Sequence, residues 1–218
     1  MKAGYEVFEI LGYISAIATC IPAVVTLFRG KKFLQQLLPV LIYAWLAALF
    51  EIAGFILSEL SINNLVLIHI FTIIEFASLT YLYFFLFTNR YIQIGIPVLS
   101  VAFALFAICY LVIYEAAYEM NPIPRSIEAI VLIVFSIGFF VKLLRDLQVD
   151  NLLRNTVFWI NTGILIYFAG NFFLFIFSNY VLSQPMEHFY EFWAMHSCLN
   201  IIFNGFLAYG LWQSSRRT

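Results

Sequence analysis

Two residues that could do chemistry stand inside an apolar stretch of the chain, LIHIFTIIEF, which runs from Leu67 to Phe76. His69 could bind a metal ion or carry a proton, and Glu75 could act as a base or pair with a cation. An ionisable side chain at the centre of a membrane helix costs about 2.5 to 3.5 kcal/mol to insert. Each residue therefore needs a partner, and the sequence offers Glu51, His196 and Asn200.

Other polar residues stand at helical spacing within apolar stretches. At about 100° per residue, Glu51 shares a face with small residues, His69, Thr72 and Glu75 make one broad sector, and the segment after Trp193 carries a polar stripe. The last stripe consists of Trp193, His196, Asn200 and Asn204. The candidate ligand-binding residues are Glu51, His69, Thr72, Glu75, Asn171, Trp193, His196 and Asn200.

Three helices that each present a polar face could surround a shared interior pocket. Most of the candidates fall in the outer half of their helices, so the pocket would open outward. We interpret it as a site that binds a small ligand or a proton, for transport or sensing, without a cofactor and without catalysis. The same polar faces are also typical of ordinary hydrogen-bonded packing between membrane helices.

The composition places these residues in a membrane. Of 218 residues, 64% are hydrophobic and 11% are charged, whereas a soluble domain carries roughly 25% charged residues. Because a chain of this size cannot hide so much apolar surface in one core, we expect an integral membrane protein in contact with lipid. The sequence has no basic patch beyond the short inner loops, so nucleic-acid binding has no support.

Seven apolar stretches are long enough to span a bilayer as helices. They are Val7–Phe28, Leu37–Leu60, Leu65–Phe87, Tyr91–Tyr114, Arg125–Leu144, Thr156–Phe177 and Tyr190–Trp212. The connections between them are too short for a soluble domain. The sequence therefore predicts an all-α, multi-pass protein with one transmembrane domain over residues 1–218.

The basic residues predict the orientation. Along a seven-helix path one side collects Arg29, Lys31, Lys32, Arg90, Lys142, Arg145, Arg154, Arg216 and Arg217. The other side has Lys2 and Arg125 together with Glu59, Glu115, Glu119 and Glu187. The positive-inside rule then puts the N-terminus outside and the C-terminus in the cytoplasm, in a bacterial inner (cytoplasmic) membrane.

The chain also carries signs of an internal repeat. EIAGFIL (residues 51–57) parallels YFAGNFF (167–173), and HIFTIIEF (69–76) parallels HSCLNIIFN (196–204). These matches predict a parallel 3+1+3 pseudo-repeat with a first unit at 1–90, a linker helix and outer loop at 91–124, and a second unit at 125–218. The oligomeric state stays open, a homo-oligomer included.

Two resemblances follow from these features. The segment GYISAIATCIPAVVTLFRGKK (Gly12–Lys32) and the 3+1+3 topology are similar to SWEET and PQ-loop transporters, although Ala23 stands where that family has glutamine. The whole chain more closely resembles uncharacterised small seven-helix membrane proteins of Bacteroidota-type bacteria. The resemblance rests on FRGKK, on NNLVLIHIFTIIEF and on the pattern Trp193-x-x-His196-x-x-x-Asn200. It implies a seven-helix fold and no particular activity.

A zinc enzyme is the alternative interpretation. The chain resembles the alkaline ceramidase and CREST group of intramembrane lipid hydrolases in its seven helices and three outer histidines. The metal candidates are His69, His196 and Glu75, whose nitrogen and oxygen atoms suit Zn²⁺. The chain lacks the HxxxH spacing that would put two ligands on one face of its last helix.

Overall fold

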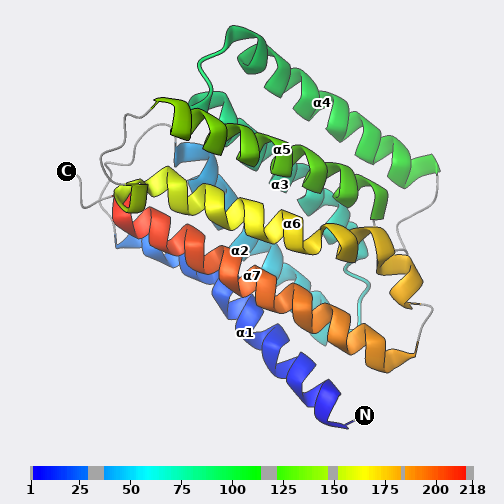
Figure 1. The fold of residues 1–218 in the computed structure, drawn as a ribbon. Helices are drawn as coiled ribbons and strands as arrows, with labels where there is room; N and C mark the ends of the chain where they lie inside the picture. Colours follow the sequence, from blue (N-terminus) through cyan, green and yellow to red (C-terminus); the bar gives the residue numbers. More distant parts are fainter. Residues whose placement is uncertain (1, 29–36, 114–121, 147–151, 183–184, 215–218) are drawn as a thin grey trace.

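The computed structural model describes residues 2–28, 37–113, 122–146, 152–182 and 185–214. Within these ranges the chain forms seven α-helices and one short 3-10 helix (Figure 1), which confirms the all-α fold class. They are α1 (Lys2–Leu27), α2 (Leu38–Glu59), α3 (Leu65–Leu86), α4 (Arg90–Ile113), α5 (Pro122–Asp146), η3 (Leu152–Arg154), α6 (Thr156–Leu182) and α7 (Met186–Ser214).

Asparagine side chains help to start the helices where the apolar stretches begin. The Oδ1 atom of Asn89 accepts a hydrogen bond from the backbone N–H of Tyr91 (2.8 Å) at the start of α4. Asn155 does the same for Val157 (2.9 Å) and Phe158 (3.2 Å) in the first turn of α6. Such side chains satisfy backbone donors that have no partner within the helix. The short polar connections therefore set where α4 and α6 begin.

Among the described residues, six helices have the length and composition of membrane spans. Helices α1 to α6 each contain a sufficiently long apolar segment, which indicates a membrane-embedded protein. The seventh predicted span, Tyr190–Trp212, lies within α7, a helix of 29 residues that is not among these six. That α7 also crosses the membrane stays a prediction.

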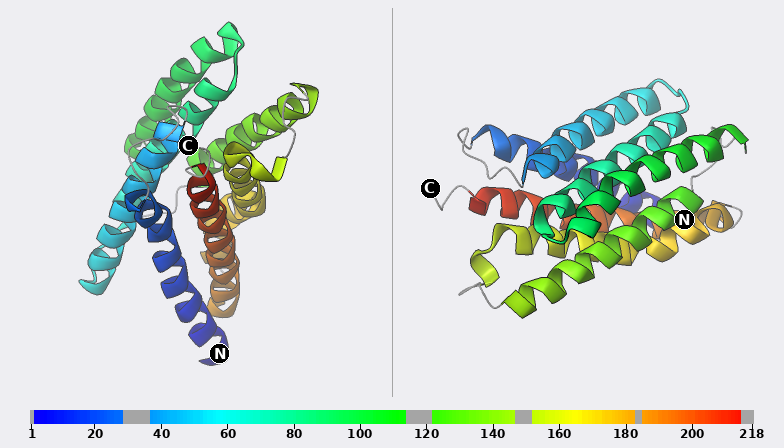
Figure 2. Two further views of the ribbon diagram at one scale, coloured as in Figure 1. Left: turned by 90° about the vertical axis from the view of Figure 1, so that its left-hand side faces the viewer. Right: turned by 90° about the horizontal axis from the view of Figure 1, so that it is seen from above.

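Six of the helices form a closed ring over the described residues. Neighbouring helices pack in the order α1, α2, α3, α5, α6, α7 and back to α1, while α4 lies outside and packs against α3 and α5 (Figures 1 and 2). Exchanging α1–α3 for α5–α7 leaves this order unchanged, as a parallel repeat requires. The repeat itself and the unit boundaries at 90 and 125 stay predictions.

Large apolar side chains fill the interior of the ring and also cover its outer surface. Tyr83, Phe168 and Phe203 are fully buried. In contrast, Ile17 of α1 and Val134 of α5 are 67% and 61% exposed. Large apolar side chains that point outward along most of the length of a helix suit contact with lipid.

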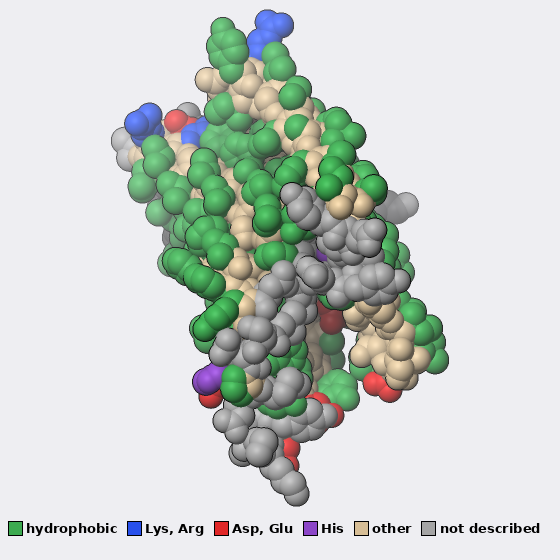
Figure 3. Space-filling view, turned by 90° about the vertical axis from the view of Figure 1, so that its right-hand side faces the viewer, with side chains coloured by type: hydrophobic (Ala, Val, Ile, Leu, Met, Phe, Trp, Pro, Cys, Tyr) green, Lys and Arg blue, Asp and Glu red, His purple; other side chains and the backbone are tan. Residues whose placement is uncertain are grey.

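The two ends of the bundle differ in charge (Figure 3). We call the end at which α1, α5 and α7 begin the acidic end, and the opposite one the basic end. The acidic end has Glu6, Glu9, Glu59, Arg125, His188 and Glu191. The basic end has Arg90, Lys142, Arg145, Asp146 and Arg154. This asymmetry is the one on which the predicted orientation rests.

Several residues used for that orientation lie outside the described ranges. They are Arg29, Lys31, Lys32, Glu115, Glu119, Arg216 and Arg217. The side chains of Lys2 and Glu187 are likewise outside what the structure describes. The orientation stays a prediction that the described charges favour.

Candidate functional site

Glu75 lies at the centre of a buried polar cluster inside the ring. Its side chain, near the middle of α3, is 2% exposed. The Tyr43 hydroxyl of α2 donates a hydrogen bond to Glu75 Oε1 at 3.0 Å. Arg125 of α5 places Nη2 3.9 Å from Glu75 Oε2. The carboxylate therefore joins three helices, and its cost of burial is offset by a hydroxyl and a guanidinium.

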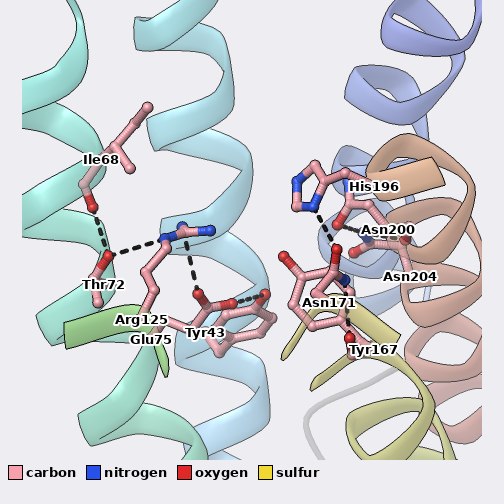
Figure 4. A network of polar contacts seen from close by, with 10 residues as sticks. All are labelled: Tyr43, Ile68, Thr72, Glu75, Arg125, Tyr167, Asn171, His196, Asn200 and Asn204. Carbon is pink, nitrogen blue, oxygen red and sulfur yellow. Dashed lines mark hydrogen bonds and ion pairs between the residues drawn. The ribbon is translucent and has the colours of Figure 1, made fainter. Parts of the chain in front are cut away.

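Arg125 reaches into the bundle from the acidic end of α5 (Figure 4). Its Nε donates a hydrogen bond to the Thr72 Oγ1 at 3.3 Å, and the Thr72 hydroxyl itself donates to the Ile68 carbonyl at 2.9 Å. The guanidinium also lies 5.0 Å from the centre of the Phe175 ring, which is a cation–π distance. Helices α3 and α6 thus hold the positive charge in place.

Glu128 stands one turn after Arg125 on α5 and is fully buried. Neither of its carboxyl oxygens has a hydrogen-bond partner in the described part of the chain. Helix α5 packs against α3 and α6, and its face with Arg125 and Glu128 turns toward the interior of the ring.

A second cluster joins α6 and α7. His196 Nδ1 lies 2.8 Å from Asn171 Oδ1, and Asn171 Nδ2 donates to the Tyr167 carbonyl at 2.9 Å. Because the amide of Asn171 uses its donor on Tyr167, its oxygen faces His196 and Nδ1 is the ring nitrogen that donates. The Trp193 ring stands almost perpendicular to the imidazole at 5.2 Å. The imidazole is therefore held by one hydrogen bond and by aromatic edges.

Asn200 connects α7 to α1. Its Nδ2 donates to Ser15 Oγ at 2.8 Å and to Thr19 Oγ1 at 2.9 Å. Asn204 Nδ2 in turn donates to Asn200 Oδ1 at 3.0 Å. The predicted polar stripe of α7 thus faces two neighbours, α6 through His196 and α1 through Asn200. Much of this stripe serves helix packing, as hydrogen-bonded interfaces in membranes do.

A cavity of about 500 Å³ lies between these clusters and the acidic end. It runs from Glu9 and Glu59, near that end, to Tyr43 and Glu75 near the middle of the bundle. Figure 3 shows the hollow at the acidic end, with acidic side chains at its rim and within it. In the left view of Figure 2, α2 diverges from α1 toward this end, which opens the space between them.

The structure places five of the eight candidate residues on the cavity wall. They are Glu51, Glu75, Trp193, His196 and Asn200. The other three, His69, Thr72 and Asn171, are buried and do not line the cavity. Thr72 and Asn171 contribute indirectly, because Thr72 accepts a hydrogen bond from Arg125 and Asn171 bonds to His196.

The expected partners of Glu75 were wrong. The sequence suggested Glu51, His196 and Asn200, whereas Glu75 contacts Tyr43 and Arg125. Glu51 has no hydrogen bond or ion pair with any described residue, although it lines the same cavity.

The metal candidates do not form a group. Among the described residues, no three His, Cys, Asp or Glu side chains come close enough to hold a metal ion. His196 points Nδ1 at Asn171, and Glu75 is engaged by Tyr43 and Arg125. The zinc hydrolase interpretation therefore gains no support from the geometry.

Sequence reasoning missed four residues of the site: Tyr43, Arg125, Glu128 and Tyr167. Tyr43 stands two turns before Glu51 and shares a face with Ala47, so the stripe on α2 could have been extended to it. Arg125 was one of two cations on the acidic side, against the prevailing charge. A cation that breaks the charge pattern in this way could have been recognised as one with a buried partner. Glu128, three residues later, lies on the same face of the helix as Arg125.

No family model, curated protein or solved structure matches the chain. The resemblances to SWEET transporters and to the Bacteroidota-type proteins therefore stay predictions. The interpretation of the site rests on its own geometry.

Proposed function

We propose that this chain is a seven-span membrane protein whose cavity binds a small ligand from the outer side, as the binding step of transport or sensing. The observation that carries the proposal is the cavity of about 500 Å³, a volume typical of small-molecule sites. Its wall combines aromatic surface with a few convergent polar groups, among them Glu75, Arg125 and His196.

The position of α7 supports its role as the seventh span. It packs along α1 and α6, both of which are long and apolar enough to cross a membrane. The polar groups that lower its hydropathy, such as Asn200 and His196, are hydrogen-bonded to α1 and α6 rather than turned outward. A helix with such polar groups can sit in a bilayer because neighbours satisfy them.

Hydrogen bonds between α3, α5 and α6 in the described part of the chain support access from the acidic end. Here the Tyr83 hydroxyl donates to Asn161 Oδ1 at 2.8 Å, and Asn161 exchanges hydrogen bonds with Ser136. These residues tie α3, α5 and α6 together beyond the end of the cavity, and all three are fully buried. With the N-terminus outside, the cavity is an outward-facing one.

The test is ligand-dependent thermal stability of the purified protein, measured with a panel of amines, amino acids, sugars and carboxylates. We expect at least one compound to raise the unfolding temperature, and Glu75→Ala or His196→Ala to reduce that shift. The matched controls are His188→Ala and Glu191→Ala, since both residues are exposed on α7. Equal shifts in all four variants, or no shift with any compound, would rule out a binding cavity.

A further inference from the structure

The charges on the cavity wall are strongly unequal. Four carboxylates line it, those of Glu9, Glu51, Glu59 and Glu75, whereas the described wall has one cation, Arg125. That cation is already engaged by Glu75, Thr72 and the Phe175 ring. The wall therefore has no free positive charge for an anion and an excess of negative charge for a cation.

Glu51 is the carboxylate of the cavity wall that a cationic ligand would stabilise most. It lies in the middle of the cavity face of α2, between Tyr43 and Ser58, and is partly buried. It makes no hydrogen bond and no ion pair with any described residue, unlike Glu75. A carboxylate at this depth in a membrane protein is costly unless something neutralises it.

The space beside Glu51 is kept open by small residues. Ala47 precedes it by one turn and Gly54 follows by three residues, and both line the cavity. A Cβ atom built on Gly54 would come no closer than 3.8 Å to another atom, the Nδ2 of Asn64. A ligand group can therefore approach the Glu51 carboxylate.

Aromatic rings line the same cavity as this carboxylate. They come from four helices, with Tyr13 on α1, Phe55 on α2, Phe71 on α3 and Trp193 on α7. The negative faces of such rings attract organic cations, and the combination of several rings with a carboxylate is the chemistry that recognises ammonium groups. A small hydrated metal ion would instead need several oxygen ligands close together.

We propose that the cavity takes an organic cation, an ammonium group on an apolar body, with Glu51 as its counter-ion and the aromatic walls around it. This inference rests on the proposed function and adds the chemical class of the ligand. The ammonium group could belong to a soluble amine or to an aminophospholipid headgroup, since both present the same charge to Glu51.

The experiment measures binding of three probes of similar size to the purified full chain by calorimetry: benzyltrimethylammonium, benzyl alcohol and phenylacetate. We expect the cation to bind most tightly and Glu51→Gln to weaken it about tenfold, the effect of losing one charge contact. Glu191→Gln, an exposed carboxylate on α7, is the matched control and should bind the cation like the wild type. Glu51→Gln keeps the size of the side chain and removes no hydrogen bond within the described structure, so it should fold.

Two further measurements, in nanodiscs of different lipids, distinguish a lipid headgroup from a soluble amine as the source of the ammonium group. If phosphatidylethanolamine nanodiscs weaken cation binding relative to phosphatidylglycerol nanodiscs, and Glu51→Gln abolishes the difference, the group comes from the lipid. If both nanodiscs give the same affinity, a soluble amine is the ligand. Either result supports the cation site.

The inference is overturned if phenylacetate or benzyl alcohol binds as tightly as the cation, or if Glu51→Gln leaves cation binding unchanged. The proposed function survives that failure as long as another compound of the panel still stabilises the wild type and the Glu75 and His196 variants lose the effect. The two failures are therefore distinguishable.

Discussion

Arg125 of α5 and Glu75 of α3 form an ion pair inside the helix ring, with Nη2 and Oε2 3.9 Å apart. The pair is fixed from both sides, because Tyr43 donates to the other carboxylate oxygen and Thr72 accepts from the guanidinium. It lies at the inner limit of the cavity and links the two halves of the ring through α3 and α5. The stability of the bundle and the shape of the cavity therefore depend on the same residues.

Replacing Glu75 with glutamine should lower the free energy of unfolding by about 3 kcal/mol. The substitution removes the negative charge and leaves the buried Arg125 without its counter-ion, and breaking a buried pair from one side costs about 3 to 5 kcal/mol. The loss is measured by thermal or detergent unfolding of the purified protein. The double variant Glu75→Gln, Arg125→Met should recover part of it, because the uncompensated charge is then gone.

Glu128→Gln is the matched control for this prediction. Glu128 is equally buried and stands one turn from Arg125, yet neither carboxyl oxygen has a hydrogen-bond partner in the described part of the chain. Its amide replacement removes no hydrogen bond, so we expect a change below about 1 kcal/mol. If Glu128→Gln destabilised the protein as much as Glu75→Gln, Glu128 would be the main partner of Arg125 and the pairing described here would be wrong.

The elements of this fold could be read from the sequence because they follow local rules. The lengths of the apolar stretches predict the helices to within one residue at several ends, as for Leu65–Leu86. The angular position of His196 and Asn200 on one stripe also follows from helical spacing alone. The depth of a residue along a helix and the face of the helix on which it lies depend on that helix alone.

Partners across helices could not be predicted in this way. The contact of Glu75 with Arg125 depends on α3 lying next to α5, and the sequence does not state the order of helices around the ring. Without that order, Glu51 and His196 were equally good partners for Glu75. Arg125 was also assigned to the membrane surface, because its position near a helix start reveals nothing about how its long side chain is directed.

Replacing Gly163 with alanine should destabilise the contact between α6 and α7. A Cβ atom on Gly163 would lie 2.8 Å from the Cβ of Phe206 and 3.3 Å from Cδ2 of Phe203. A Cβ cannot swing away as a side-chain end can, so the helices must separate. Overpacking of this kind typically costs about 1 to 3 kcal/mol, and unfolding of the purified variant measures it.

Alanine substitutions at two other glycines serve as controls for the destabilisation expected of Gly163→Ala. Gly170→Ala should cost less, since the three atoms nearest to the added methyl belong to the flexible side chain of Leu199. Gly205→Ala should be neutral or slightly stabilising, because nothing lies within 4 Å of its added methyl and alanine favours a helix over glycine by about 1 kcal/mol. A similar loss for all three would mean that backbone effects, and not the α6–α7 contact, decide the outcome.

Single cysteines at the two ends of α3 should show that its first residue is outside and its last residue inside. The native Cys20, Cys109 and Cys198 are first replaced by serine, and a cysteine is then placed at Ile62 or at Thr88. Ile62 lies in the connection that precedes α3, at the acidic end, and Thr88 follows α3 at the basic end. We expect a membrane-impermeant maleimide to label Ile62→Cys in intact cells and Thr88→Cys only after the membrane is opened. The reason is that Arg90, Lys142, Arg145 and Arg154 gather at the basic end, and such residues are retained on the cytoplasmic side. The reverse labelling pattern would turn the cavity toward the cytoplasm, and the ligand would then have to be an intracellular one.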